Sequence, residues 1–203
     1  MVDHKGEKVD GDELLCILAT RDDRVISYQS YLGVVGTVMS NLGLEQALKQ
    51  RNIAFERTAV GDRYVLQCLQ KKSWLLGGEG SGHIINLNHT TTGDGLITAL
   101  QILRIIQMTE KSLHQLKQVM IKRPQVLINV PAPRSSIDLK RYSKLNQAVI
   151  EAGRELQNDG RVLLRASGTE PVLRVMVEGN DKKKIKSIAK TLVEQIIIHI
   201  NGL

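Results

Sequence analysis

The residues best suited to chemistry in this sequence lie in one short run, residues 165–174. An arginine stands at each end of the run, and two hydroxyl side chains and a glycine lie between them. A phosphate dianion requires several convergent donors, and arginine supplies planar, charge-assisted pairs of them. A glycine can adopt the positive φ that turns successive backbone N–H groups toward one anion. We therefore predict a phosphate-binding loop formed by Arg165, Ser167, Gly168, Thr169 and Arg174, with an ordinary β-hairpin whose arginines are solvated as the alternative.

A second run, residues 77–83, has the composition of a loop that a ligand approaches closely. Four of its seven residues are glycine, and apolar segments that are typical of short strands precede and follow it. The side chains of Glu79 and Ser81, together with the backbone at Gly82, can bind the hydroxyl groups of a sugar. His83 closes the run, either as a functional group or as a histidine that a neighbouring residue satisfies at the start of a strand.

Six segments that include these two loops resemble the α-D-phosphohexomutase family, in the same order along the chain. They are residues 1–12, 35–41, 60–65, 77–83, 90–95 and 165–179. The resemblance is strongest to the members that interconvert glucosamine 6-phosphate and glucosamine 1-phosphate for UDP-N-acetylglucosamine and cell-wall synthesis. It runs through nearly the whole chain. Half of a phosphomannomutase or a phosphoglucomutase is the nearer alternative.

The resemblance also implies that half of the enzyme is missing from this sequence. Family members have four domains and about twice this length, with a phosphorylated serine in the first domain and a magnesium loop in the second. The nearest acidic clusters, residues 10–12 and 22–24, match neither element. We therefore interpret the chain as a C-terminal half that is inactive alone and holds no metal ligand. Mg²⁺ is expected in the full-length enzyme, and a bisphosphorylated hexose is expected as the intermediate.

The family assigns roles to the residues of both loops. The loop at residues 165–174 would hold whichever phosphate of the sugar is not reacting. Glu79, Ser81 and Gly82 would hold ring hydroxyls in both orientations of the bisphosphate. His83 is a candidate acid–base or hydrogen-bonding group, and Arg63 is a candidate secondary contributor, with a surface salt bridge as its alternative role.

The composition is that of a cytoplasmic globular protein. Of its 203 residues, 42% are hydrophobic, and no apolar run reaches the ~20 residues that a membrane-spanning helix needs. Cys16 and Cys68 are expected to be free thiols. The net charge of +7 comes partly from lysines at 182–190, on a helix whose other face is apolar. A basic nucleic-acid-binding module is the alternative from another class, although aromatic residues are only 3% of the chain and form no stacking platform. The expected partners are a phosphosugar, the missing domains and a second copy in a homodimer.

The pattern of apolar residues predicts an α/β fold: a doubly wound α/β/α domain followed by a smaller α+β two-layer domain. We expect residues 1–20 to be a poorly packed remnant of a preceding domain, residues 21–121 to form the sugar-binding domain and residues 122–203 the phosphate-binding domain. In the first domain, alternating strands and helices place ligand loops at strand ends. The helix expected over residues 94–108 has Leu96, Leu100, Leu103 and Ile106 or Gln107 as its predicted inner side. The other elements are expected as strands over 31–35, 53–60, 74–77, 84–87, 125–130, 162–164 and 172–177, and as helices over 11–19, 42–50, 62–72, 139–156 and 182–200.

Overall fold

The computed structural model describes residues 1–21, 32–132, 143–167 and 170–201. The chain divides into two compact units, Met1–Lys122 and Arg123–Leu203, and each is described here by itself. The acidic cluster at residues 22–24 and the first part of the helix expected over 139–156 lie outside the described residues.

Unit 1 is built on a four-stranded sheet in the order β2-β1-β3-β4. The central strand β1 is parallel to β2 and β3, whereas β3 and β4 form an antiparallel hairpin. β1 and β2 are each followed by a helix, which carries the chain back to the edge of the sheet where the strand began. The next strand therefore runs in the same direction. The strands are β1 (Gly33–Thr37), β2 (Ala54–Thr58), β3 (Leu76–Gly78) and β4 (Ile84–Asn86).

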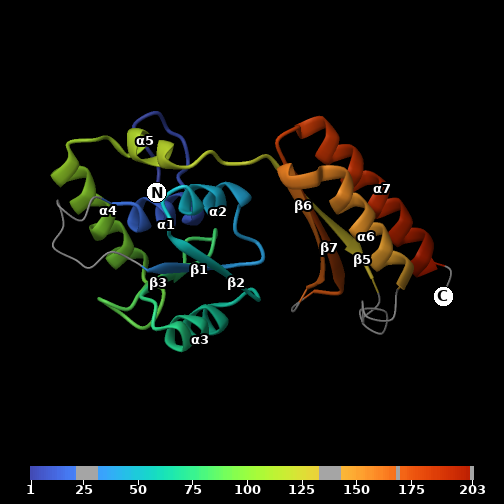
Figure 1. Ribbon diagram of the computed structural model, residues 1–203, viewed down its shortest axis with the longest axis horizontal. Helices are drawn as coiled ribbons and strands as arrows, with labels where there is room; N and C mark the ends of the chain where they lie inside the picture. Colours follow the sequence, from blue (N-terminus) through green and yellow to red (C-terminus); the bar gives the residue numbers. More distant parts are fainter. Residues whose placement is uncertain (22–31, 133–142, 168–169, 202–203) are drawn as a thin grey trace. The chain divides into compact units, whose positions relative to one another are not determined.

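Helices cover both faces of this sheet, as Figure 1 shows. One face packs Val34, Leu76 and Ile84 against a core that includes α1, α2 and α4. The other face packs Val35 and Ile85 against α3. These helices are α1 (Gly11–Ala19), α2 (Leu42–Lys49), α3 (Asp62–Lys72) and α4 (Gly95–Thr109), and α5 (Leu113–Leu116) with the 3-10 turn η1 (Lys117–Val119) follows them. Neither α5 nor η1 was predicted from the sequence, because one turn of helix is too short for a periodic pattern.

The predicted inner side of α4 is wrong for its three leucines, whereas Ile106, one of the two alternatives for its last position, packs against the core of unit 1. The buried residues are Thr98, Ile102 and Ile105, whereas Leu96, Leu100 and Leu103 are 79%, 66% and 51% exposed. Apolar side chains surround most of this helix, so its sequence contains two stripes with helical spacing. The stripe that packs on the sheet carries a β-branched threonine and two isoleucines, and the leucine stripe faces outward.

The expectation that residues 1–20 pack poorly is also wrong. Every residue of α1 is buried, and Leu15 and Cys16 are completely inaccessible within the core of unit 1. A bridge between Val2 and Lys8 closes the preceding turn. The buried carboxylate of Asp3 joins this turn to η1, because Lys117 Nζ donates to Asp3 Oδ2 over 2.8 Å. That ammonium group lowers the pKa of Asp3 far below its ordinary value. The assignment of residues 1–20 to a preceding domain stays a prediction.

Unit 2 is a two-layer α+β structure. Its antiparallel sheet has the order β5-β7-β6, and α7 packs on β5 and β7 while α6 packs on β6. Alternate residues of the central strand, Leu173, Val175 and Val177, lie in the core under these helices. The elements are β5 (Gln125–Pro131), α6 (Ser143–Leu156), the 3-10 turn η4 (Gln157–Asp159), β6 (Gly160–Ala166), β7 (Val172–Gly179) and α7 (Lys182–Asn201).

The observed architecture confirms the predicted fold class, an α/β/α unit followed by a two-layer α+β unit. Cys16 and Cys68 are free thiols, as expected, although Cys68 is only partly buried. The lysines of α7 are exposed around a buried apolar face, which is the arrangement of an ordinary solvated helix. Among the described residues, none of the helices combines the length and the apolar character that crossing a membrane would require.

Candidate functional site

Two loops of unit 1 meet at the edge of the sheet where the parallel strands end. The first of them follows β2 and ends at Gly61, where α3 begins with Asp62 and Arg63, and the second, residues 79–83, connects β3 to β4. Since β1 is parallel to both β2 and β3, the carboxyl ends of these strands lie at one edge. The Gly61 N–H donates to Glu79 Oε1 over 2.9 Å, which joins the two loops directly. Gly61 has φ +130°, a conformation that L side chains rarely adopt, so a glycine is required at this junction.

His83 extends this contact into a three-residue cluster. Its Nδ1 lies 3.3 Å from Oδ2 of Asp62, the first residue of α3. One ligand atom from each of Asp62, Glu79 and His83 lies within 4.8 Å of the other two. A third loop borders the cluster, since a Cβ at Gly93 would lie 3.2 Å from His83 Cβ. Glu79 and His83 were predicted from the sequence, whereas Asp62 was not. Its position beside Arg63 at a helix start was the available signal.

The loop at 79–83 rests on the start of α1. The Gly11 N–H donates to the Gly80 carbonyl over 3.1 Å, and a Cβ at Gly11 would lie 2.0 Å from the Glu79 carbonyl oxygen. Close approach therefore requires glycine at position 11. Gly80 lies directly over Asp12, because a Cβ at Gly80 would lie 3.1 Å from Asp12 Oδ2.

Asp12, which was given no role from the sequence, is a buried carboxyl group beneath this loop. Its Oδ2 accepts from the Asn41 N–H over 2.8 Å, and its Oδ1 has no hydrogen-bond partner among the described residues. Burial raises the pKa of Asp12 to about 6, because a charged carboxylate loses its hydration there. A carboxyl group whose pKa is raised in this way lies directly under the glycine-rich loop.

The remaining predicted residues of unit 1 lie at the surface of the same edge. Ser81 is exposed, and Gly82 has φ +106° and closes the turn by donating its N–H to the Glu79 carbonyl over 2.9 Å. Arg63 is also exposed. Its guanidinium lies 4.8 Å from the centre of the Tyr64 ring and donates to the Tyr64 hydroxyl over 3.0 Å. The surface salt bridge considered for Arg63 is thus replaced, in this structure, by a contact with an aromatic neighbour.

In unit 2, the structure brings the two predicted arginines together. Arg165 and Arg174 are directly opposite each other across β6 and β7, and Asn129 of β5 is in register with Arg174. Directly opposed residues project from the same face of a sheet, here the face away from α6 and α7. Two like charges in such positions repel each other, so this pair is suited to binding an anion between them.

Ser167 and Glu170 belong to the connection between these strands. The Ser167 N–H donates to the Val172 carbonyl over 2.9 Å, and Ser167 Oγ accepts from the Glu170 N–H over 3.3 Å. Arg174 Nη2 donates to Glu170 Oε2 over 2.8 Å, a contact that the sequence analysis did not foresee. Gly168 and Thr169, the other two predicted members of this loop, lie outside the described residues.

Both units match one protein family. Residues 10–123 match the phosphoglucomutase/phosphomannomutase alpha/beta/alpha domain III, and residues 127–195 match the C-terminal domain of the same family. A phosphoglucosamine mutase of Coxiella burnetii (strain Dugway 5J108-111) is 58% identical over 196 residues, which are 97% of this chain but 44% of that protein. The phosphoglucosamine mutase of Thioalkalivibrio sulfidiphilus (strain HL-EbGR7) is 51% identical over 97% of the chain and 44% of its own length. The chain therefore spans less than half the length of these relatives.

Solved structures show the same fold. An Aspergillus fumigatus N-acetylphosphoglucosamine mutase in complex with GlcNAc-6P and magnesium matches 97% of this chain and 49% of its own chain, with a TM-score of 0.81 and 17% identity. An N-acetylglucosamine-phosphate mutase of the alpha-D-phosphohexomutase superfamily, in a product complex, matches 96% of this chain and 45% of its own chain, with a TM-score of 0.78 and 20% identity.

Proposed function

This chain belongs to the phosphoglucomutase/phosphomannomutase family, and on that premise we propose that it is the sugar- and phosphate-binding half of an enzyme that interconverts glucosamine 6-phosphate and glucosamine 1-phosphate. The observation that carries the proposal is the cross-strand pair of Arg165 and Arg174 beside Ser167, in a chain 58% identical to a phosphoglucosamine mutase. The pair would hold the phosphate that does not react.

The phosphate socket, defined as Arg165, Ser167, Gly168, Thr169 and Arg174, works by charge and by geometry. Two guanidinium groups on one face of the sheet neutralise a dianion and orient it through paired N–H donors. In phosphoryl transfer, positioning and charge stabilisation supply most of the catalysis. A socket that recognises only the phosphate can accept the two ends of a bisphosphorylated hexose in turn.

The loops of unit 1 would hold the sugar ring. Glu79 has one carboxylate oxygen bonded to the Gly61 N–H, which orients the group so that the other oxygen can accept from a ring hydroxyl. Ser81 and the backbone of Gly82 would add contacts beside it. Asp62 orients the His83 ring through Nδ1, and His83 is thereby a proposed hydrogen-bonding or acid–base group. Arg63, already placed over an aromatic ring, is a proposed secondary contact.

The remaining chemistry of the whole enzyme would come from domains outside this chain. They would supply the phosphorylated serine and the Mg²⁺ site. Mg²⁺ prefers oxygen ligands in octahedral geometry. In the cluster of Asp62, Glu79 and His83, the histidine offers an imidazole nitrogen, and the Glu79 carboxylate already accepts a hydrogen bond from the Gly61 N–H. This cluster therefore does not fit magnesium. The cytoplasmic location and the homodimer expected from the sequence stay predictions.

A residue-resolved NMR titration of the 203-residue chain tests the proposal. Glucosamine 6-phosphate is expected to shift the amides of the phosphate socket and of residues 79–82 in a saturable manner. In parallel titrations, inorganic phosphate is expected to shift the socket but not residues 79–82, and mannose 6-phosphate is expected to shift residues 79–82 less than glucosamine 6-phosphate does. Shifts at residues 79–82 that are equal for both sugar phosphates would favour a phosphomannomutase or phosphoglucomutase half instead.

A matched pair of variants assigns the socket. Arg165→Ala is expected to abolish the response to glucosamine 6-phosphate, whereas Arg154→Ala, on helix α6, is expected to leave it unchanged. An unchanged affinity in folded Arg165→Ala would overturn the socket assignment. A short DNA duplex serves as a further arm, and saturable DNA binding at the lysines of α7 without any sugar-phosphate response would favour the nucleic-acid alternative.

A further inference from the structure

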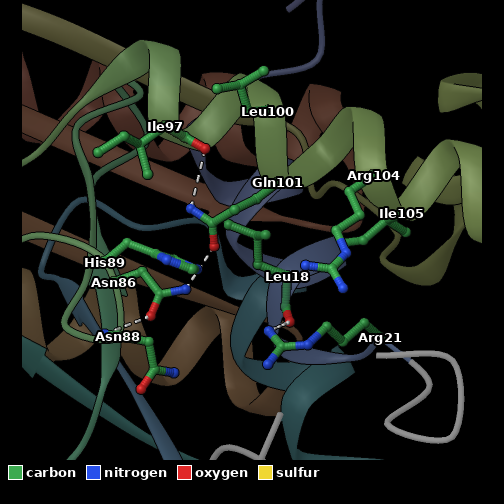
Figure 2. A pocket seen from close by; sticks show the side chains of 10 residues that line it. All are labelled: Leu18, Arg21, Asn86, Asn88, His89, Ile97, Leu100, Gln101, Arg104 and Ile105. Carbon is green, nitrogen blue, oxygen red and sulfur yellow. Dashed lines mark hydrogen bonds between the residues drawn. The ribbon is translucent and has the colours of Figure 1, made fainter. Parts of the chain in front are cut away.

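Unit 1 contains a cavity of about 390 Å³ that is separate from the candidate site (Figure 2). It lies between the end of α1, the end of β4 and one side of α4. Asn86 in its wall is opposite Leu76, the first residue of β3, whereas the candidate site begins after Gly78 at the other end of the hairpin. The lining residues are Leu18, Arg21, Asn86, Asn88, His89, Ile97, Leu100, Gln101, Arg104 and Ile105.

Two arginines are among the described residues that line this cavity. Arg21 and Arg104 both line it, and Figure 2 shows the Arg104 guanidinium reaching toward the part of the wall formed by Leu18 and Arg21. None of the ten described lining residues is an aspartate or a glutamate. Arg21 Nη1 donates to the Leu18 carbonyl over 3.1 Å, which anchors this guanidinium at the end of α1. A guanidinium has five N–H donors, so an anchored arginine can still bind an oxyanion.

The polar wall of the cavity is held in place before any ligand arrives. Asn86 is only 2% exposed, and its Nδ2 donates to Gln101 Oε1 over 2.6 Å. Gln101 Nε2 donates to the Ile97 carbonyl over 3.2 Å, and Asn86 Oδ1 accepts from the Asn88 N–H over 3.2 Å. Figure 2 shows this chain of hydrogen bonds along one side of the cavity. A preordered wall lowers the entropic cost of binding a small molecule.

Apart from His89, the other described residues of the wall are apolar. They are Leu18, Ile97, Leu100 and Ile105, and Leu100 is 66% exposed. Cavities that bind small molecules usually have volumes of about 300–1,000 Å³, mostly apolar walls and a few polar groups that orient the ligand. This cavity has each of these properties, together with two cationic groups.

We propose that the cavity is a second binding site, which takes a small organic anion with an apolar body. Its phosphate or carboxylate group lies against Arg21 and Arg104, and its apolar body lies against Leu100 and Ile97. The site is independent of the proposed function, because it shares no residue with the phosphate socket or with the loops at 61–63 and 79–83.

Phenyl phosphate is the probe for this site, because it joins an oxyanion to an apolar ring. In a residue-resolved NMR titration of the whole chain, we expect saturable shifts at the amides of Asn88, Leu100 and Gln101. Inorganic phosphate, which lacks the ring, is expected to bind there at least tenfold more weakly. The amides of residues 165–167 report separately on the phosphate socket, so the two sites are distinguished in one experiment.

Three variants test the contacts. Arg104→Gln and Leu100→Glu are each expected to weaken phenyl phosphate binding at the cavity at least tenfold. Leu103→Glu is the matched control, since Leu103 is also an exposed leucine of α4 but does not line the cavity. The Leu103→Glu variant is expected to bind phenyl phosphate with the affinity of the unchanged chain. Shifts confined to residues 165–167, or equal weakening by Leu100→Glu and Leu103→Glu, would overturn the second site. Shifts confined to the cavity would support it and count against the phosphate socket.

Discussion

At the scale of single residues, Glu170 is a competitor for the proposed phosphate. Its carboxylate accepts from Arg174 Nη2 over 2.8 Å, at a position where a bound phosphate would need the same donors. Exposed ion pairs of this kind contribute about 0.2–1 kcal/mol. An anion that binds at Arg174 must first displace this carboxylate or share the guanidinium with it.

We therefore predict that Glu170→Gln increases the affinity of the chain for glucosamine 6-phosphate by at most about fivefold, the factor that corresponds to the upper end of this range. Isothermal titration calorimetry of the variant and the unchanged chain measures the difference. Glu155→Gln, on α6, is the control for the loss of one negative charge. A weaker affinity in Glu170→Gln would show that Glu170 supports the ligand instead of competing with it.

The buried carboxyl of Asp12 predicts a pH dependence of stability. Its pKa is raised from 3.8 to about 6 in the folded chain, so the folded state binds more protons than the unfolded state between these values. Stability must then fall as pH rises through this window, by about 3 kcal/mol for a shift of this size. Below pH 3.8 the group is neutral in both states, and it no longer contributes to the pH dependence.

Asp12→Asn removes this titration, while the new amide oxygen can still accept from the Asn41 N–H. We expect the free energy of unfolding of this variant to rise relative to that of the unchanged chain, by about 3 kcal/mol between pH 4 and pH 7. Urea unfolding at a series of pH values measures the difference. If the free energies of unfolding of the variant and of the unchanged chain change equally with pH across this range, the raised pKa of Asp12 is contradicted.

At the scale of elements, α4 shows where a sequence pattern is insufficient. Both the stripe of Leu96, Leu100 and Leu103 and the stripe of Thr98, Ile102 and Ile105 have the spacing of a buried helix face. Hydrophobicity alone favours the leucines, and the structure buries the other stripe. The choice depends on which side chains fit the surface of a sheet that forms from distant residues, and local spacing does not contain this information.

Two neighbouring substitutions test which stripe is buried. Ile102 is completely inaccessible, so Ile102→Ala is expected to destabilise unit 1 by about 2–5 kcal/mol, through lost burial and the cavity that it leaves. Leu103→Ala removes an exposed side chain and is expected to change stability by less than about 0.5 kcal/mol. Thermal or urea unfolding measures both. The opposite order of the two effects would restore the inner side predicted from the sequence.

At the scale of the whole molecule, the sequence predicted the order of the main elements well but not the contacts that assemble the site. Glu79 was recognisable as a loop residue, because a glycine-rich run after an apolar strand is a local signal, whereas Gly61 was included only through the family resemblance of residues 60–65. The pairing of Asp62 with His83, and the packing of Gly11 and Asp12 under Gly80, depend on the parallel pairing of β1 with its neighbours. The register of Arg165 with Arg174 required only that a short hairpin form, and both residues were predicted.

The separate core of unit 2 predicts that this unit folds without unit 1. Unit 2 has its own sheet and its own core of buried residues, including Leu173, Val175, Ile185 and Leu192. A region with a separate core can fold without its neighbour in the chain. We expect residues 123–203, produced alone, to give a dispersed ¹H–¹⁵N spectrum that overlays on the same residues of the whole chain.

All five residues of the phosphate socket belong to unit 2. The isolated unit is therefore expected to bind inorganic phosphate with the affinity of the whole chain, within about twofold. A tenfold loss would mean that residues of unit 1 contribute about 1.4 kcal/mol to phosphate binding. The isolated unit should lose any preference for glucosamine 6-phosphate over mannose 6-phosphate, because Glu79 and Ser81 lie in unit 1. Parallel titrations of the isolated unit and of the whole chain measure both quantities.

A retained preference for the amino sugar would place its recognition in unit 2, and an undispersed spectrum would show that the core of unit 2 depends on unit 1. Phosphate binding and sugar recognition are thus expected to separate with the two units.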